Sequence, residues 1–231
     1  MTLVIAHRGA SADERENTVA AFRKARDLGA DWVELDARRT ADGVIVVHHD
    51  AHLADGRLIA EYEVGELPDE LPSLAEALEA CEGMGVNIEI KNLPDDPDFD
   101  ADHLVSDAVA GLARAYLDLE NVLVSSFNID AIDRIKQIDP ELPTAYLAGD
   151  MGDPARGVAR TLAHGHQAFH PYQALVDPLL VERAHEAGIA INVWTVDDPD
   201  RIGELVRMRV DGIVTNDVAT GRRVVDEVLS G

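Results

Sequence analysis

The sequence contains little cysteine, little lysine and few aromatic residues, and it has no long apolar run. Cys81 is the only cysteine among 231 residues, so an intramolecular disulfide is impossible. The length is enough for one well-filled core. No apolar stretch approaches the ~20 residues that span a bilayer. The opening segment, MTLVIAHRGA, lacks the basic and long apolar parts of a signal peptide. These absences predict a cytoplasmic protein without integral membrane association.

The charge is strongly one-sided. Forty-four acidic residues face twenty basic ones, a net charge of -24, and only Lys24, Lys91 and Lys136 of the basic residues are lysine. Acid excess with lysine depletion is typical of proteins from salt-loving cytoplasms, where short-range screening weakens self-repulsion. An ordinary acidic protein is the alternative. Such a surface repels nucleic acid and anionic membranes, so we expect a small-molecule partner and no nucleic acid. The sequence does not define an oligomeric state.

Short β-type runs alternate with helical patterns along the whole chain, which is typical of βα units and a parallel sheet. Strands are predicted at 3–6, 32–36, 86–90, 122–125, 143–147, 167–170, 190–194 and 212–215. Helices are predicted between them, for example at 17–28, 73–82, 102–118, 129–138, 178–187 and 199–208. Eight such units predict an α/β fold, a single (β/α)₈ TIM-type barrel that forms one domain over residues 1–231. An open doubly wound sheet is the alternative.

One further strand-like run, 44–49, does not fit this alternation. Only about seven residues separate it from the 32–36 strand, whereas a parallel crossover needs a dozen or more. The run must therefore return antiparallel, as a β-hairpin extension after strand 2. The dipeptide Asp42–Gly43 favours a two-residue type I′ turn. Such a turn predicts that His49 lies opposite Asp36, and a slip of one residue would move His49 to the other face.

Polar residues collect where the predicted strands end, which is where barrels of this type carry their active sites. Glu34 and Asp36 share one face of strand 2, and Glu89 ends strand 3 beside Lys91. Three carboxylates inside an apolar barrel are costly unless paired, and a divalent cation offsets that cost. All-oxygen ligation favours Mg²⁺ or Ca²⁺, or Mn²⁺, over Zn²⁺. Buried salt bridges with neighbouring arginines or Lys91 are the alternative.

Two histidines are candidates for acid–base chemistry, because imidazole titrates near neutral pH. His7 follows the first predicted strand, and His49 ends the predicted hairpin. His48 should point away from His49. The remaining histidines of loops and helices, including His164 and His166, are expected to be ordinary polar residues.

The same residues form a pattern that closely resembles the glycerophosphodiester phosphodiesterase family. The blocks are IAHRG, ENT, VELDARRTADGVIVVHHD and NIEIK, followed by SSF at 125–127, VWTVDD at 193–198 and DGIVTND at 211–217. The similarity covers most of the chain in the family's order. It implies a barrel that hydrolyses glycerophosphodiesters to glycerol 3-phosphate and an alcohol with a divalent metal.

The resemblance also implies a role for each matching residue. His7 and His49 match the general acid–base pair. Glu34, Asp36 and Glu89 match the metal ligands. Arg8 and Lys91 match the phosphate-binding residues, Trp194 matches a residue that lines the site, and Glu16 is expected to orient Arg8 or to add a contact to the metal shell. Asn17 and Thr18 are expected to cap a helix.

The sequence departs from the family pattern in two places. The segment after the HHD motif is short, which leaves the substrate's identity open. Asn216 stands where the family commonly has Asp directly after Thr, and we expect no effect of this change on the chemistry. Two alternatives therefore remain: a related barrel phosphodiesterase that acts on lysophospholipids or archaeal lipid head groups, and a non-catalytic barrel that binds a phosphodiester. The intact set of candidate site residues argues against the second.

Overall fold

The computed structural model describes residues 2–149 and 153–231, and it confirms the predicted barrel. Eight parallel strands close on themselves, because β1 pairs with both β9 and β2. The barrel strands are β1 (Leu3–His7), β2 (Trp32–Arg39), β4 (Gly85–Ile90), β5 (Val122–Ser126), β6 (Thr144–Ala148), β7 (Ala168–Pro171), β8 (Ala190–Val193) and β9 (Gly212–Thr215).

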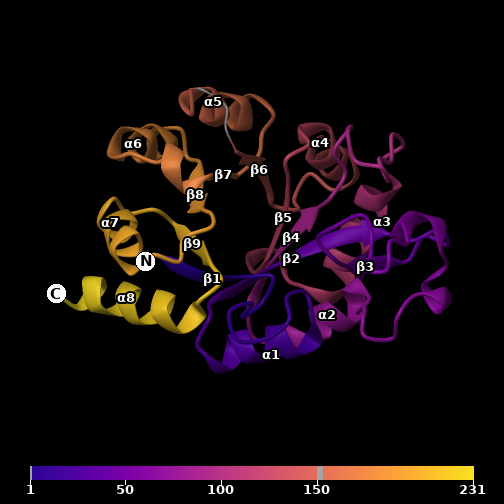
Figure 1. The fold of residues 1–231 in the computed structure, drawn as a ribbon. Helices are drawn as coiled ribbons and strands as arrows, with labels where there is room; N and C mark the ends of the chain where they lie inside the picture. Colours follow the sequence, from indigo (N-terminus) through magenta and orange to yellow (C-terminus); the bar gives the residue numbers. More distant parts are fainter. Residues whose placement is uncertain (1, 150–152) are drawn as a thin grey trace.

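The helices follow one another around the strands in sequence order (Figure 1). They are α1 (Val19–Asp27), α2 (Leu74–Ala80), α3 (Leu104–Tyr116), α4 (Ile129–Ile138), α5 (Ala155–Ala163), α6 (Pro178–Glu186), α7 (Pro199–Arg207) and α8 (Val218–Ser230). Their starts are encoded locally. Thr18 caps α1 by accepting the Ala21 N–H at 3.2 Å, as expected for this position, and Ser73 forms a capping box with Glu76 on α2.

The main core lies between the strands and the surrounding helices, where each helix buries one apolar face. Phe22 of α1, Ile132 of α4 and Phe169 of β7 are fully buried there. Cys81 is also buried, and burial raises the pKa of its thiol to about 12, so it is an inert part of this core. The core therefore fixes the strand positions whose C-terminal ends carry the polar residues.

The predicted hairpin is present, but its predicted register is wrong by one residue. β3 (Ile45–Val47) pairs antiparallel with the end of β2, with Ala37 opposite Val47. The turn has three residues rather than two, because the Thr40 N–H bonds the Val44 carbonyl at 2.9 Å and Gly43 takes a left-handed φ of +85°. His48, not His49, is consequently the residue whose N–H bonds the Asp36 carbonyl, at 3.0 Å.

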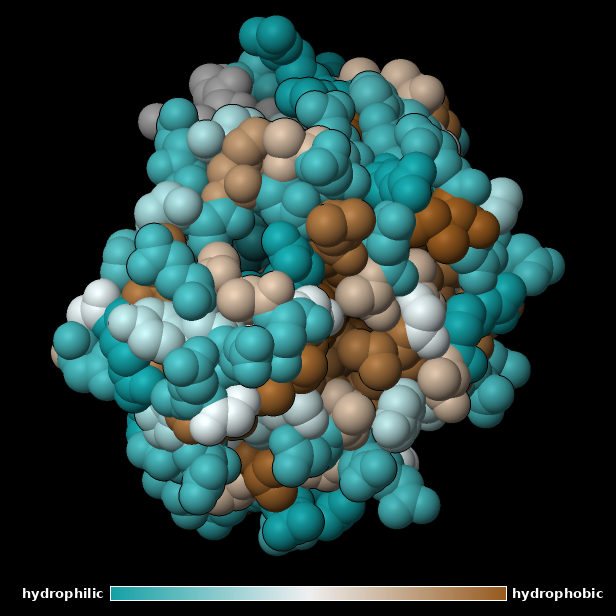
Figure 2. Space-filling model, turned by 90° about the vertical axis from the view of Figure 1, so that its right-hand side faces the viewer, coloured by the Kyte–Doolittle hydropathy of each residue, from teal (hydrophilic) through white to brown (hydrophobic). Residues whose placement is uncertain are grey.

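The segment that follows the hairpin, residues 48–72, folds over it with two 3₁₀ turns, η1 (Ile59–Glu61) and η2 (Val64–Glu66). A small cluster of Val46, Leu53, Ile59 and Leu67 holds this segment in place. Figure 2 shows the face of the molecule that carries β3 and α3, where hydrophilic side chains dominate around a hydrophobic patch. Within the described ranges, no helix has the length and apolar character that crossing a membrane requires.

Candidate active site

A cavity of about 170 Å³ opens at the C-terminal ends of the barrel strands. It brings together most of the residues singled out from the sequence, although they come from distant parts of the chain. Its polar lining comprises His7, Arg8, Glu34, His49, Asn87, Glu89, Lys91, His170, Trp194 and Thr195. The parallel barrel explains this meeting, because all strand ends of one polarity lie at one end of the fold.

The three carboxylates expected to bind metal lie together beside this cavity. Glu34 and Asp36 come from β2, and Glu89 on β4 is the register partner of Asp36. One oxygen from each carboxylate lies within 4.8 Å of the others, and all three side chains are buried. Glu34 Oε1 has no hydrogen-bond partner among the described residues. A buried acceptor without a donor fits a cation, so the donor set suits an oxygen-preferring divalent ion.

The electrostatics of the cluster are uneven. Burial raises the pKa of Glu34 well above its usual range, and the Asp36 and Glu89 carboxylates raise it further. Burial likewise raises the pKa of Glu89. Burial opposes ionisation of Asp36 too, but Lys91 and Arg8 together lower its pKa to about 2. Asp36 is therefore the permanently charged member, while Glu34 pays the largest penalty for ionising without a bound cation.

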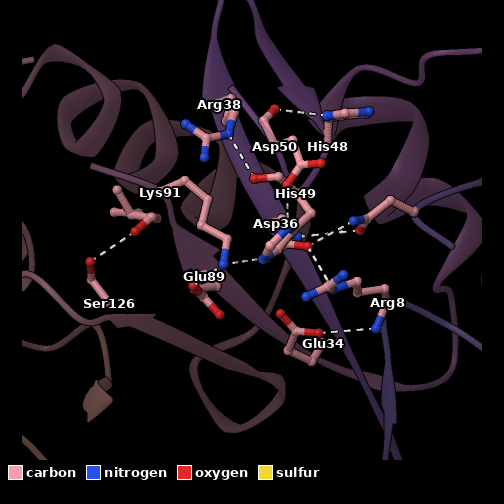
Figure 3. A network of polar contacts seen from close by, with 12 residues as sticks. Arg8, Glu34, Asp36, Arg38, His48, His49, Asp50, Glu89, Lys91 and Ser126 are labelled. Carbon is pink, nitrogen blue, oxygen red and sulfur yellow. Dashed lines mark hydrogen bonds and ion pairs between the residues drawn. The ribbon is translucent and has the colours of Figure 1, made fainter. Parts of the chain in front are cut away.

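Two positively charged side chains, Lys91 and Arg8, contact Asp36 from opposite sides (Figure 3). Lys91 Nζ lies 3.1 Å from Asp36 Oδ1 and also contacts Glu89. Arg8 Nε lies 3.2 Å from Asp36 Oδ2. The Arg8 side chain is also held at 3.0 Å by Glu16, which is half-exposed and does not line the cavity. The buried salt bridges expected as the alternative to a metal site are therefore present. Glu34 Oε1, in contrast, has no hydrogen-bond partner among the described residues.

The backbone at the end of β1 is built to present Arg8. Arg8 and Gly9 both adopt left-handed conformations, with φ of +55° and +82°. A side chain at position 9 would come within 2.7 Å of the Ala21 backbone, so only glycine allows this turn to pack on α1. The turn also lets the Arg8 N–H donate to Glu34 at 3.0 Å, which explains the local requirement for glycine in HRG.

His7 is oriented by a residue from the other end of the chain. Its Nδ1 bonds Asn216 Oδ1 at 2.7 Å, and its Nε2 lies 4.0 Å from Glu34 Oε2. Asn216 donates its amide N–H to Asp197 at 2.7 Å, so its oxygen must face the imidazole. His7 therefore carries its proton on Nδ1 and leaves Nε2 free towards the cavity. Burial, and then Arg8, lower the pKa of His7 below its usual value.

His49 lines the same cavity, although the hairpin register differs by one residue from the predicted one. The chain leaves the β3 ladder after Val47, and the Arg38 Nε–H donates to the His49 carbonyl at 2.9 Å, which fixes the backbone there. The His49 Nδ1 bonds the Asp50 carboxylate at 2.8 Å. Burial and the Lys91 charge lower the pKa of His49. His48 bonds the Asp50 carbonyl at 2.8 Å and does not line this cavity, as expected.

Aromatic side chains form one wall of the cavity mouth. Trp194 packs edge-on against Phe127 at 5.4 Å between ring centroids and contacts Tyr172 at the same distance. The Trp194 indole N–H donates to the His170 carbonyl at 2.8 Å, which fixes the ring. Such a wall offers an apolar surface to the carbon part of a ligand.

Three site residues were missed or misjudged from the sequence. Asn17 was expected to cap α1, but it is buried with a φ of +56° and donates to Asp36 at 2.7 Å. Asn216 was expected not to affect the chemistry, yet it contacts His7 directly. Phe127 was seen only as part of the SSF block. Asn216 and Phe127 both follow the end of a predicted strand, and this position could have marked them as site residues. For Asn17, the only signal was a polar residue just before a helix, which also fits a helix cap.

A closed (β/α)₈ barrel that gathers buried carboxylates, Arg8, Lys91 and two histidines at its C-terminal face has the architecture of a barrel enzyme. Residues 7–220 match the model of the glycerophosphoryl diester phosphodiesterase family, and the chain belongs to this family. It is accordingly a phosphoric diester hydrolase.

Individual relatives agree with this assignment. A glycerophosphodiester phosphodiesterase of Caldanaerobacter subterraneus subsp. tengcongensis is 33% identical over 95% of this chain and 96% of its own length. Among solved structures, a phosphodiesterase of Oleispira antarctica, determined in complex with the product sn-glycerol-3-phosphate, has a TM-score of 0.88 with 26% identity, covering 98% of this chain and 97% of that one. A glycerophosphodiester phosphodiesterase of Thermotoga maritima has a TM-score of 0.82 with 29% identity, covering 97% and 98%.

Proposed function

We propose that the protein hydrolyses glycerophosphodiesters to sn-glycerol 3-phosphate and an alcohol in a metal-dependent reaction, with His7 and His49 as the general acid–base pair. The observation that carries this proposal is the meeting of both imidazoles with the buried carboxylate cluster at one small cavity. The product bound to the Oleispira antarctica relative supports the glycerophosphate part of the substrate.

Glu34, Asp36 and Glu89 would hold the divalent cation, and their all-oxygen donor set favours Mg²⁺ or Ca²⁺, or Mn²⁺. When bound, such an ion neutralises phosphate charge and polarises the P–O bond. Lys91 and Arg8 already lie against this cluster, so they can bind the remaining phosphate oxygens without large movements. Glu16 acts by orienting Arg8.

The two histidines supply the proton transfers. His7 Nε2 is free to take a proton because Nδ1 is committed to Asn216. His49 reaches the cavity from the hairpin side, and Asp50 holds its Nδ1. With one imidazole deprotonating the nucleophile and the other protonating the leaving oxygen, the charge on the reacting oxygens stays low. Trp194 packs against the carbon skeleton of the substrate.

A second candidate substrate class follows from a wider groove of about 700 Å³ that adjoins the cavity and shares His49, Glu89, Lys91 and Phe127 with it. Its remaining lining includes the apolar side chains Leu53, Ile90, Leu93 and Pro97. A groove of this kind suits a larger, partly apolar substrate, such as a lysophospholipid or a diester with an archaeal lipid head group. A non-catalytic phosphodiester-binding barrel is disfavoured, because both histidines line the cavity.

An activity screen tests the proposal. Glycerophosphodiesters with small head groups, a lysophospholipid and an archaeal lipid head-group diester are each incubated in molar KCl with Mg²⁺ or with EDTA, and the phosphomonoester product of each is measured by phosphorus NMR. We expect metal-dependent release of glycerol 3-phosphate from the small diesters. Preference for the lipid substrates would favour the second class, and binding without turnover would favour the non-catalytic barrel. We also propose that the chain works as one domain in a salt-rich cytoplasm, which its acid excess supports.

A further inference from the structure

A second cluster of metal-ligating side chains lies away from the active site, between α4 and the connection from α5 to β7. It comprises Asp133 of α4, His164 at the end of α5 and His166, which precedes β7 by two residues. One donor atom from each residue lies within 4.8 Å of the others. The cluster stands at the N-terminal end of β7, whereas the active site is at the C-terminal ends of the strands.

The buried member of this cluster has a ring nitrogen without a well-aligned hydrogen bond among the described residues. The His166 side chain is fully buried, and its Nδ1 bonds Thr144 Oγ1 at 2.9 Å. Its Nε2 faces Asp133 Oδ1 at 3.2 Å but forms no hydrogen bond within the described part of the chain. A polar atom in this position needs a partner.

The other two residues complete the arrangement. His164 Nδ1 lies 2.8 Å from Asp133 Oδ2, and the two imidazole rings are near parallel at 6.0 Å between centroids. The two imidazole nitrogens therefore face different oxygens of one carboxylate, an arrangement in which a cation can replace both contacts. The His164 side chain is 36% exposed, which leaves an entry path and room for a water ligand.

The chemistry of this donor set differs from that of the catalytic carboxylates. Two imidazoles and one carboxylate suit Zn²⁺ and related transition metals, whereas three carboxylates suit Mg²⁺ or Ca²⁺. Lys136 on the same helix donates to the carbonyls of Pro140 and Leu142, so its hydrogen bonds are directed to that loop and not to Asp133.

We propose that Asp133, His164 and His166 form a transition-metal site for Zn²⁺, separate from the catalytic cluster, that ties α4 to the α5–β7 connection. Metal bound there stabilises the folded chain, since the unfolded chain does not hold the three ligands together. The site is not required for the hydrolytic chemistry, because none of its residues lines the active-site cavity.

Binding of Co²⁺ and Zn²⁺ to the full chain tests the proposal. The protein is stripped with EDTA, returned to buffer with excess Mg²⁺ to fill the oxygen site, and titrated with Co²⁺ by visible absorption, then with Zn²⁺ in competition. We expect one Co²⁺ with the absorption of a nitrogen-containing site, displaced by Zn²⁺, and a Zn²⁺-dependent rise in melting temperature.

Variants of the proposed ligands test where the ion binds. Replacing the buried His166 endangers the fold, so His164→Ala and Asp133→Asn carry the test. Changes even in the outer shell of metal sites weaken binding roughly 10–100-fold, so loss of a ligand should cost at least as much. His185→Ala is the matched control, because His185 forms a similar 2.9 Å contact with Asp211 without a second imidazole. Equal Co²⁺ and Zn²⁺ binding by all these proteins, or no binding by the unaltered chain, would overturn the proposal.

Discussion

His7 and Asn216 are joined by a 2.7 Å hydrogen bond between Nδ1 and Oδ1, which links the end of β1 to the end of β9. Asn216 is itself fixed, because its backbone and side-chain N–H groups both donate to Asp197. Its amide oxygen can therefore face only the imidazole and the Ser11 hydroxyl, which donates to it at 2.9 Å. The result is a histidine with one defined tautomer and one free nitrogen at the cavity.

Asn216→Ala should lower kcat with little change in KM. The loss of a hydrogen bond to a buried group costs about 1–3 kcal/mol, which corresponds to roughly 5–150-fold in rate. The bond to Asn216 also raises the pKa of His7 in opposition to burial, so the variant should shift the acid limb of kcat/KM to lower pH. Ser11→Ala, which keeps the His7–Asn216 bond, is the control. An acid limb that stays in place would assign Asn216 a merely structural role.

Glu34→Gln should have opposite effects on the metal-free and the metal-bound protein. The raised pKa of Glu34 means that the folded state keeps a proton which the unfolded chain has lost, so the unfolding free energy of the metal-free protein falls as pH rises above the ordinary glutamate value. The glutamine amide does not ionise, so Glu34→Gln should stabilise the metal-free protein at pH 8. It should also reduce the stabilisation by Mg²⁺, which is about 2.7 kcal/mol at a hundredfold excess over Kd.

Urea unfolding of both proteins with EDTA and with Mg²⁺ measures these changes. Asp36→Asn is the informative comparison, because Asp36 is paired with both Arg8 and Lys91 and its neutral form leaves them without a counter-charge. That variant should destabilise the metal-free protein. An undiminished Mg²⁺ effect in Glu34→Gln would exclude this carboxylate as a ligand.

His170 should make the protein sensitive to mild acid. Burial lowers its pKa to about 3, and the neutral ring accepts a hydrogen bond from Asn192 at 2.9 Å. Below pH 6.5 the unfolded chain binds a proton that the folded chain does not, so the unfolding free energy falls as pH drops from 6.5 towards 3. At pH 5, this loss of unfolding free energy due to His170 reaches about 2 kcal/mol.

Urea unfolding at pH 7 and pH 5 of the original protein and His170→Gln isolates this contribution. The variant should lose less stability between the two pH values, and His52→Gln, at an exposed position, should behave like the original protein. Equal pH dependence in all three proteins would contradict the assignment of a neutral, buried His170.

Salt should stabilise the fold. With a net charge of -24, repulsion between surface carboxylates is long-ranged at 0.01 M salt, where the Debye length is about 30 Å, and short-ranged at 1 M, where it is about 3 Å. The melting temperature should therefore rise from dilute buffer to molar KCl, and kcat/KM for an anionic substrate should rise with it. A melting temperature that is flat or falls across the series would remove the salt-loving interpretation and leave the barrel unaffected.

The fold could be predicted from the sequence because periodicity and strand spacing are local signals. The barrel, its strand positions and the existence of the hairpin all followed from them. The hairpin register did not, because it depends on whether the turn holds two residues or three, and Asp42–Gly43 is compatible with both. The bond from Arg38 to the His49 carbonyl, which holds the backbone beside the cavity, is a tertiary contact that the local sequence does not indicate.

The candidate site was predictable to the extent that strand ends of one polarity converge. The clustering of Glu34, Asp36 and Glu89 was predicted in this way. The contact between His7 and Asn216 was not, because 209 residues separate the two in sequence and only closure of the barrel brings them together. The same holds for the Asn17 amide, whose left-handed backbone turns it from a helix start towards Asp36.

The most direct test of the proposed chemistry compares three histidine variants in the release of glycerol 3-phosphate from a small glycerophosphodiester at saturating Mg²⁺. His7→Ala and His49→Ala should each lower kcat by roughly 10²–10⁴, the usual contribution of a positioned acid or base, while circular dichroism and Mg²⁺ binding stay unchanged. His48→Ala is the matched control, since His48 adjoins His49 but does not line the cavity, and it should keep near-full kcat. Near-full kcat in either His7→Ala or His49→Ala would contradict the two-histidine mechanism.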